Sequence, residues 1–276
     1  MKRAKRINLF FFLVACVLAV FYAFPFLLVL INSVKDKRSV RNEPLALPQE
    51  FMWENFTNAI KKMDYWQALG NSLIITVISV VAIIITSSML AYYLARSKSK
   101  FSTVTFLVLV ASMIVPFQAL MIPFVGLFGE RGLNMPGNQF TIAFFYVGFG
   151  VALSTFLYHG FISNIPYELD EAAAIDGASP FKTFRKIIFP MLGPVTATVA
   201  IINALWIWND FLLPSVVLIE TDQKTLPLKT FVFYGKYTSD YGLAMAGLLL
   251  SIIPILIFYF IMQRKIISGI SAGAVK

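Results

Sequence analysis

The sequence contains very little of what enzymes use for chemistry. It has one cysteine, Cys16, and one histidine, His159, and each lies within an apolar run. A single cysteine cannot form an internal disulfide, and two such distant residues cannot build a His/Cys metal site or a Cys-His nucleophile alone. We therefore predict no metal, no cofactor and no catalytic residue for this chain.

Charged residues are also scarce. They make up 13% of the 276 residues, against about 25% in soluble domains, whereas apolar residues reach 58%. A soluble protein of this composition would expose large apolar patches, so a lipid bilayer is the simpler explanation. The net charge of +9 is typical of cytoplasmic anchoring in a membrane protein, and no basic patch with interleaved aromatics indicates nucleic-acid binding.

A third absence concerns nucleotides. The chain has no phosphate-binding loop of the GxxxxGK[ST] type. The sequence therefore predicts that this chain does not hydrolyse ATP itself.

Long apolar runs are what the sequence does contain. Crossing the hydrocarbon core takes about 20 residues, and the backbone of a spanning segment must bond internally, so we expect helices. The first run is too long for a signal-peptide core and lacks an Ala-x-Ala site, which indicates a retained anchor. Six runs qualify: residues 8–31, 72–94, 103–128, 141–162, 195–219 and 243–262. The sequence thus predicts an all-α membrane protein with six transmembrane helices in one domain, 1–276.

Prolines and basic residues refine this picture. We expect kinks or breaks at the prolines embedded in the runs, which are Pro25, Pro116, Pro123, Pro214 and Pro254. Of the 23 Lys and Arg, thirteen fall in 1–7, 95–102, 163–194 and 263–276. Because cytoplasmic loops carry the excess of Lys and Arg, we predict that both termini are cytoplasmic.

The longest predicted cytoplasmic loop, 163–194, has the pattern of two short helices. Asn164 is expected to cap the first helix, acidic residues occupy its first turns, and Gly177 ends it. Ser179 and Pro180 begin the second helix, which Pro190 ends. The second helix has an apolar face of Phe181, Phe184, Ile187 and Ile188 and a basic face of Lys182, Arg185 and Lys186. The pattern alone also allows a plain amphipathic pair at the membrane surface.

The spacing within this loop resembles a known motif. Glu171-Ala172-Ala173, three residues, Gly177, nine residues and Ile187-Ile188-Phe189-Pro190 is similar to the EAA loop of bacterial ABC importer permeases, with Phe189 in place of Leu. The resemblance implies a loop that fits a cleft of a separate ATPase and transmits its closure to the membrane helices. The implied ATPase-coupling residues are Asp170, Glu171, Ala172, Ala173, Asp176, Gly177, Ile187 and Pro190.

Three other segments resemble one branch of that family. They are residues 208–214 (WNDFLLP), Asn71-Ser72-Leu73 and the C-terminal segment 263–276. They are similar to the six-span subunit of carbohydrate importers of the maltose-transporter type, with the type I ABC importer fold. This resemblance implies a second, different permease subunit, two ATPase subunits, an extracytoplasmic sugar-binding protein and a bacterial cytoplasmic membrane.

Polar residues within the fifth run are candidates for the substrate path. Asn203, Asn209 and Asp210 lie at membrane depth, where ionisable and polar groups are functional candidates by default. For Asp210 a structural role, as the partner of a helix terminus or of the sister subunit, is an open alternative. Trp206 and Trp208 can stack on a sugar ring, although a place at the membrane interface is the more common reason for tryptophan there.

Other functions remain open at this stage. An ABC permease for a non-sugar solute is compatible with the loop, although 208–214 and 263–276 speak against it. An ion-driven secondary transporter predicts inverted repeats, which we do not find between 8–128 and 141–262. An intramembrane enzyme lacks its catalytic pair. The sequence does not indicate which sugar is carried.

Overall fold

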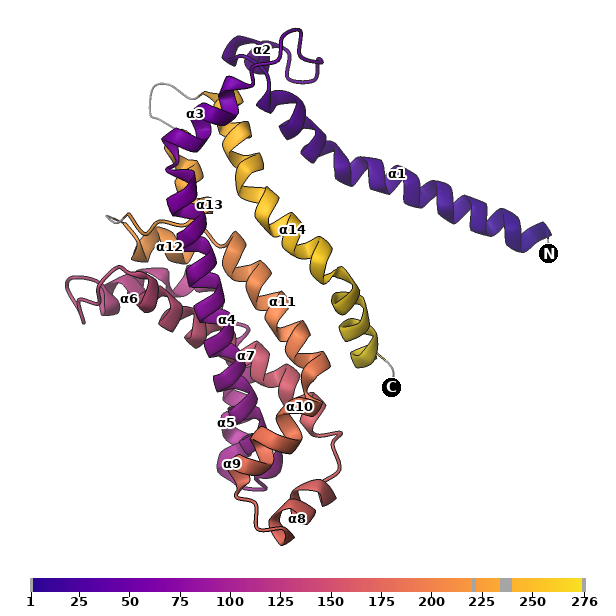
Figure 1. The fold of residues 1–276 in the computed structure, drawn as a ribbon, viewed down its shortest axis with the longest axis vertical. Coiled ribbons are helices and arrows are strands. Elements are labelled where there is room, and N and C mark those ends of the chain that lie inside the picture. Colours follow the sequence, from indigo (N-terminus) through magenta and orange to yellow (C-terminus); the bar gives the residue numbers. More distant parts are fainter. Residues whose placement is uncertain (1, 220–221, 234–239, 275–276) are drawn as a thin grey trace. The chain divides into compact units, whose positions relative to one another are not determined.

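The computed structural model describes the backbone of residues 2–219, 222–233 and 240–274 and the side chains of 11–219, 222–233 and 240–263. Within these ranges the chain is helical and contains no strand, which confirms the predicted all-α class (Figure 1). The α-helices are α1 (Lys2–Ser33), α2 (Lys37–Asn42), α3 (Glu54–Lys62), α4 (Tyr65–Arg96), α5 (Lys100–Ser112), α6 (Phe117–Phe128), α7 (Gln139–Ile162), α8 (Glu168–Ile175), α9 (Pro180–Thr183), α10 (Phe189–Met191), α11 (Gly193–Asn209), α12 (Leu212–Val217), α13 (Leu226–Lys229) and α14 (Tyr241–Ala274). A π-helical turn, η1 (Phe184–Ile188), joins α9 to α10, and a 3-10 turn, η2 (Thr230–Phe233), follows α13.

The chain forms two compact units. One comprises Met1–Trp66 and Lys229–Pro254, and the other comprises Gln67–Leu228 and Ile255–Lys276. The second unit contains most of α4, the bent helices α5 and α6, and all of α7 to α12. It holds every candidate functional residue discussed below.

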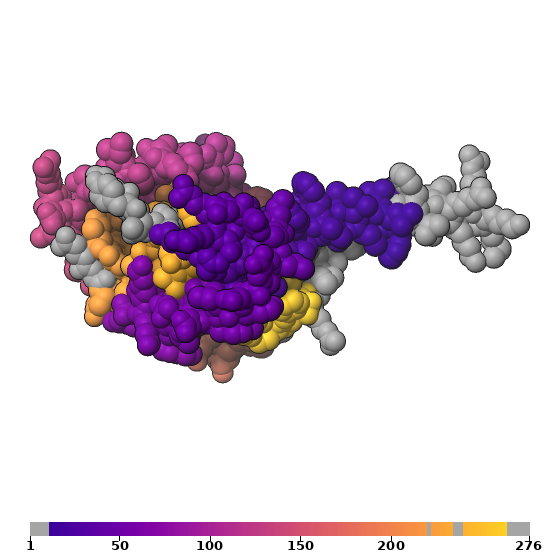
Figure 2. All heavy atoms as spheres, turned by 90° about the horizontal axis from the view of Figure 1, so that it is seen from above, coloured from indigo at the N-terminus to yellow at the C-terminus, as the bar shows by residue number. Residues whose placement is uncertain are grey.

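In the first unit, α1 presents its apolar side chains outward. In the most apolar window of Phe11–Ser33 no residue is buried, and α1 is exposed over most of its described length (Figure 2), whereas Asn32 and Ser33 at its end are buried. Such a surface is stable only in contact with lipid or another apolar chain. At its end, the Asn55 side-chain amide of α3 donates to the backbone carbonyls of Ser33 and Lys35, at 2.9 Å each.

In the second unit, α7 forms the centre and packs against α5 and α11. Its inward side chains are fully buried, among them Ile142, Tyr146, Tyr158 and Ile162. At Gly150 the helices approach so closely that an added Cβ would lie 2.6 Å from Ile83 Cδ1 of α4 and 2.9 Å from Asn203 Oδ1 of α11. A side chain at position 150 would therefore displace the Ile83 and Asn203 side chains.

Among the described residues, four helices are long and apolar enough to cross a membrane, and two bent pairs bring the number to as many as six. The continuous candidates are Phe11–Ser33, Tyr65–Arg96, Gln139–Ile162 and Tyr241–Gln263. The pairs are Lys100–Ser112 with Phe117–Phe128, bent by 104°, and Pro180–Met191 with Gly193–Asn209, bent by 78°. These segments overlap the six predicted runs, with differences at the breaks.

One proline lies at a break, one lies just after a break, and three lie away from any break. Pro116 precedes α6 at the sharp bend, as predicted. The predicted run 195–219 is divided, because α11 ends at Asn209 and α12 begins at Leu212. Pro214 offers no N–H to the Asp210 carbonyl and its ring crowds that group, so a continuous helix is disfavoured there. By contrast, Pro25, Pro123 and Pro254 lie inside α1, α6 and α14.

Candidate functional site

The loop between α7 and α11 folds into two short arms, which we call the bracket (residues 163–192). Its first arm, α8, begins with Glu168, Asp170 and Glu171 in the first turn, where the helix dipole favours negative charge. The predicted cap at Asn164 is wrong. The Asn164 side chain donates to the Gly160 carbonyl at 2.8 Å, so it closes α7, and α8 starts only after Tyr167.

Gly177 ends the first arm, as predicted. Its φ of +74° lies in the left-handed region that side chains disfavour. The N–H of Ala178 donates to the Ala173 carbonyl at 2.9 Å and that of Gly177 to the Ala174 carbonyl at 3.0 Å. This pair of bonds is a Schellman motif, which satisfies the last carbonyls and fixes the direction of the turn.

The second arm begins as predicted and ends later than predicted. The Ser179 hydroxyl accepts from the Lys182 N–H at 3.3 Å, and Pro180 occupies the first turn. Helical structure continues through Pro190 to Met191, so the predicted stop at Pro190 is wrong by one residue, and the bend lies at Leu192. The π-helical turn η1 ends at Ile188, two residues before Pro190. Its wider ring accommodates a residue that cannot complete the ordinary i to i−4 ladder.

The apolar face of the second arm attaches the bracket to the helices. Phe184 and Ile188 are buried in the core of the second unit, and Ile187 packs against that core. The Phe184 ring lies 5.3 Å from the Tyr92 ring of α4. Phe181, predicted for the same face, is 58% exposed and does not take part. The second arm is therefore attached to the helices through Phe184, Ile187 and Ile188 and not through Phe181.

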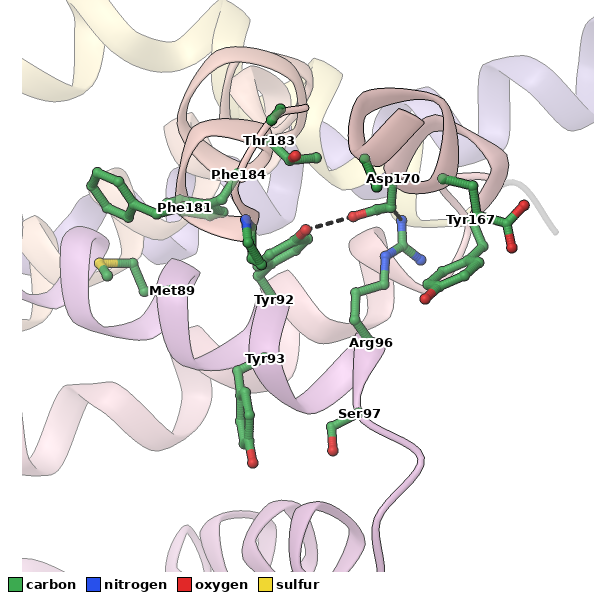
Figure 3. Close-up of a pocket in the computed structure, with 14 residues that line it drawn as sticks. Met89, Tyr92, Tyr93, Arg96, Ser97, Tyr167, Asp170, Phe181, Thr183 and Phe184 are labelled. Carbon is green, nitrogen blue, oxygen red and sulfur yellow. Dashed lines mark hydrogen bonds and ion pairs between the residues drawn. The ribbon is translucent and has the colours of Figure 1, made fainter. Parts of the chain in front are cut away.

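A polar contact attaches the first arm to α4. Asp170 Oδ2 lies 2.9 Å from Arg96 Nη2, and the Tyr92 hydroxyl donates to Asp170 Oδ1 (Figure 3). Arg96 also donates to the Ile165 carbonyl at 3.2 Å, and its guanidinium lies 5.5 Å from the centre of the Tyr167 ring. The side chains of Arg96 and Asp170 are only 14% and 11% exposed. We call Tyr92, Arg96 and Asp170 the latch.

A cavity of about 540 Å³ opens beside the latch, between the end of α4 and the bracket (Figure 3). Its walls include Tyr93, Tyr167 and Phe181, each of which is more than half exposed. Glu171 of α8 also lines it.

The predicted coupling residues separate into three groups in the structure. Glu171, Ala172, Asp176, Gly177 and Pro190 are exposed. Ala173 is buried and Ile187 is half-buried, while Asp170 is occupied by the latch. Sequence reasoning missed Arg96, Tyr92 and Ile175, which is 87% exposed at the end of α8. An isoleucine among acidic and small residues was a signal for Ile175, but nothing local links position 96 to position 170.

The three predicted substrate-path residues do not gather at one place. Asn203 is buried, and its amide donates to the Ser154 hydroxyl at 3.0 Å and the Val199 carbonyl at 2.8 Å. Asn203 therefore joins α11 to α7. Asn209 is exposed and donates to the Leu205 carbonyl of its own helix.

Asp210 alone faces a cavity. It lies at the break after α11, where its carboxylate accepts from the Tyr146 hydroxyl and from the Leu212 N–H, both at 3.0 Å. A cavity of about 670 Å³ borders Asp210, with Trp206, Gln118 and Ser112 among its walls. Trp206 is 40% exposed and meets the Tyr146 ring edge to face, 5.4 Å between centres. The cavity thus combines an aromatic face with polar side chains. Trp208, by contrast, is buried.

The scarce residues take no part in a cluster. His159 stacks on Phe106 with 4.1 Å between ring centres, and Cys16 is exposed on α1. In the part of the chain that the structure describes, no three His, Cys, Asp or Glu side chains could hold a metal ion together.

Several known proteins resemble this chain in sequence. Residues 87–271 match the family described as "Binding-protein-dependent transport system inner membrane component". The chain is 44% identical over 261 residues to the "Probable starch degradation products transport system permease protein AmyC" of Thermoanaerobacterium thermosulfurigenes, covering 94% of each chain. It is 37% identical over 284 residues to the "Multiple sugar-binding transport system permease protein MsmG" of Streptococcus mutans, covering all of both. It is 34% identical to the "Melibiose/raffinose/stachyose import permease protein MelC" of Bacillus subtilis, covering 96% and 95%.

A solved structure shares the fold. The chain matches the "Crystal structure of a bacterial ABC transporter involved in the import of the acidic polysaccharide alginate" with a TM-score of 0.79 and 22% identity, covering 96% of this chain and 98% of that one. This likeness confirms the predicted permease fold. The relatives confirm the predicted resemblance to carbohydrate importer permeases.

Proposed function

Since the chain belongs to the family of binding-protein-dependent transport system inner membrane components, we propose that it is the six-span permease subunit of an ATP-driven sugar importer. It is a multi-pass protein of the cytoplasmic membrane and a transport component, not an enzyme. As a member of this family it works with an ATPase and a substrate-binding protein.

The exposed end of the bracket carries the proposal. Glu171, Ala172 and Gly177 present a small, acidic surface on which another backbone can approach closely, and Ile175 projects from its edge. Ile175 lies in the same short helix as the residues that match the EAA loop, and members of this family work with a separate ATPase. We assign this surface to the ATPase, with Ile175 as the apolar contact and Glu171 and Asp176 as its charged rim.

The bracket is built to pass motion on to the membrane helices. When ATP closes the ATPase pair, the exposed end of α8 moves with it. The latch and the buried Phe184 and Ile188 then draw α4 and the core of the second unit along. ATP shifts the equilibrium between inward- and outward-facing states only through contacts that differ between them, and α8 is where those contacts enter.

The proposed substrate is a mono- or oligosaccharide. The names of the relatives refer to starch degradation products, multiple sugars and melibiose, raffinose and stachyose. The cavity beside Asp210 suits a neutral, hydroxyl-rich molecule, because the exposed Trp206 can stack on a sugar ring while Asp210 and Gln118 bond hydroxyls. Asn203 and Asn209, whose amides are engaged within the helices, play at most a supporting part.

The proposed assembly contains a second, different permease subunit, two ATPase subunits and an extracytoplasmic sugar-binding protein. The exposed apolar surfaces of α1 and of the bent pair α5–α6 are where lipid and the second permease meet this subunit. Both termini and the bracket lie on the cytoplasmic side.

Uptake measurements test this function. A strain lacking the chain is supplied with labelled mono- and oligosaccharides and, in parallel, with labelled amino acids and peptides. We expect uptake of at least one sugar to fall to background and to return when the wild-type chain is restored. Loss of amino-acid or peptide uptake with every sugar unaffected would contradict the sugar assignment while leaving the importer class intact.

A further inference from the structure

Asn71, at the first turns of α4, makes hydrogen bonds that only a carboxamide can make. Its Nδ2 donates to the backbone carbonyls of Asp222 at 2.9 Å and Lys224 at 3.2 Å. Its Oδ1 accepts from Gln139 Nε2 of α7 at 2.8 Å. The side chain is buried, and its donors and its acceptor are all engaged.

Two further bonds hold the same segment. The Leu226 N–H donates to the Ser72 hydroxyl at 2.8 Å, and the Gln139 N–H donates to Gln223 Oε1 at 2.8 Å. We call Asn71, Ser72 and Gln139 the clamp. It fastens residues 222–226 across the beginnings of α4 and α7. Since polar groups buried in an apolar helix bundle are costly unless paired, such a connected set specifies one position for the segment.

The clamp and the latch lie at opposite ends of one helix. From Asn71 to Arg96 α4 is continuous, and a rise of 1.5 Å per residue separates the two by about 38 Å. This exceeds a hydrocarbon core of about 30 Å, so the two fastenings lie on opposite sides of the membrane. Figure 1 shows α4 as one continuous helix that passes α12 and ends near α5 and α9.

We propose that α4 is a rigid helix, here called the rod, that mechanically links the two faces of the transporter. In this view Asn71, Ser72 and Gln139 are positioning residues that hold segment 222–226 as part of the surface receiving the substrate-binding protein. The inference rests on the proposed function, which places the bracket in the cytoplasm and therefore the clamp outside. A binding protein that engages 222–226 then acts on α4 directly, and α4 acts on the bracket through Arg96.

The ATPase activity of the complete transporter in proteoliposomes tests the clamp. The rate is measured against the concentration of the purified binding protein, loaded with the sugar that the uptake assay identifies. Asn71→Asp keeps the shape but removes both N–H donors and aims a carboxylate at two carbonyls. We expect the concentration for half-maximal stimulation to rise about tenfold, with the unstimulated rate unchanged, and Ser72→Ala to raise it about threefold.

Ser79→Ala is the matched control, because Ser79 is fully buried on the same helix and its hydroxyl has no hydrogen-bond partner among the described residues. It should behave as wild type. Should Asn71→Asp fail to assemble, Ser72→Ala decides alone. An unchanged half-maximal concentration in the assembled clamp variants overturns the inference, whereas a wild-type transporter that no loaded binding protein stimulates overturns the proposed function and the inference with it.

The rod itself is tested by a double variant. If the clamp and Arg96 act through one helix, their effects on the stimulated ATPase rate are coupled. The double variant Ser72→Ala with Arg96→Lys should then lower this rate by a smaller factor than the two single-variant factors multiplied together. Full multiplicativity of the two effects would show that the ends of α4 act independently.

Discussion

Asp170 and Arg96, seventy-four positions apart in the chain, meet in an ion pair of 2.9 Å that joins the bracket to the end of α4. The pair is largely shielded from solvent, and Tyr92 completes it with a hydrogen bond to the same carboxylate. Asp170 therefore faces the membrane helices and not the exposed end of α8. Its carboxylate is engaged within this subunit, whereas Glu171 and Asp176 are exposed on the surface that we propose for the ATPase.

Removing one partner of this pair should uncouple the transporter. We expect Arg96→Ala to leave the Asp170 carboxylate without its cation, to weaken attachment of the bracket by about 3 kcal/mol and to reduce sugar uptake several-fold more than ATP hydrolysis. The measurement is uptake and hydrolysis in the same proteoliposomes. Lys98→Ala removes an exposed positive charge two positions away and serves as the control.

A charge exchange separates the pair from mere loss of folding. Arg96→Asp with Asp170→Arg restores opposite charges at the same place and should recover part of the uptake lost by either single change. If the exchanged pair is no better than the worse single variant, the ion pair is not what couples the bracket to α4.

The latch marks the boundary of what the sequence could predict. Hydropathy and prolines predicted the spans and the break at Pro116, and local caps predicted Ser179 and Gly177, because these depend on neighbours along the chain. The partner of Asp170 depends on packing between distant segments and carries no local pattern. The cap at Asn164 failed for a related reason, since its side-chain amide donates to the Gly160 carbonyl and is held at the end of α7.

Gly177 should tolerate no side chain without cost. Its φ of +74° costs a branched residue about 1–2 kcal/mol, and a side chain there also stands on the surface assigned to the ATPase. We expect Gly177→Val to retain membrane insertion but to lose most sugar uptake. Gly160→Ala is a suitable control, because it is helical and an added Cβ meets nothing within 4 Å. Normal uptake by Gly177→Val would refute the lever role of the bracket.

Ile175 should matter for binding the ATPase and not for folding. It is 87% exposed, so Ile175→Ser removes no internal contact, yet burial of an isoleucine at an interface stabilises it by about 2 kcal/mol. The affinity of the membrane complex for the ATPase should fall about thirtyfold, and correspondingly less ATPase should co-purify with it. Leu133→Ser, at an exposed leucine outside the bracket, should leave co-purification unchanged.

Asn203 and Asp210 should separate stability from transport. Asn203→Ala leaves the buried Ser154 hydroxyl without its donor and should lower the thermal stability of the detergent-solubilised complex, with a cost of about 1–2 kcal/mol. Asp210→Asn keeps an acceptor for Tyr146 and should leave stability nearly unchanged while altering the apparent KM for the sugar. Equal effects of both variants on KM would mean that Asn203, too, borders the sugar path.

The orientation of the chain in the membrane can be measured by cysteine labelling, because the sequence has only one cysteine. Cys16→Ser yields a chain without cysteine, into which one exposed reporter is introduced at a time. Lys98→Cys lies between α4 and α5 near the latch, and Leu133→Cys lies in the exposed turn between α6 and α7. If both termini and the bracket are cytoplasmic, a membrane-impermeant maleimide added to spheroplasts should label position 133 at once and position 98 only after permeabilisation. Labelling in the reverse order would place the bracket outside, where no ATP-binding subunit can reach it, and would remove the physical basis of the coupling proposal.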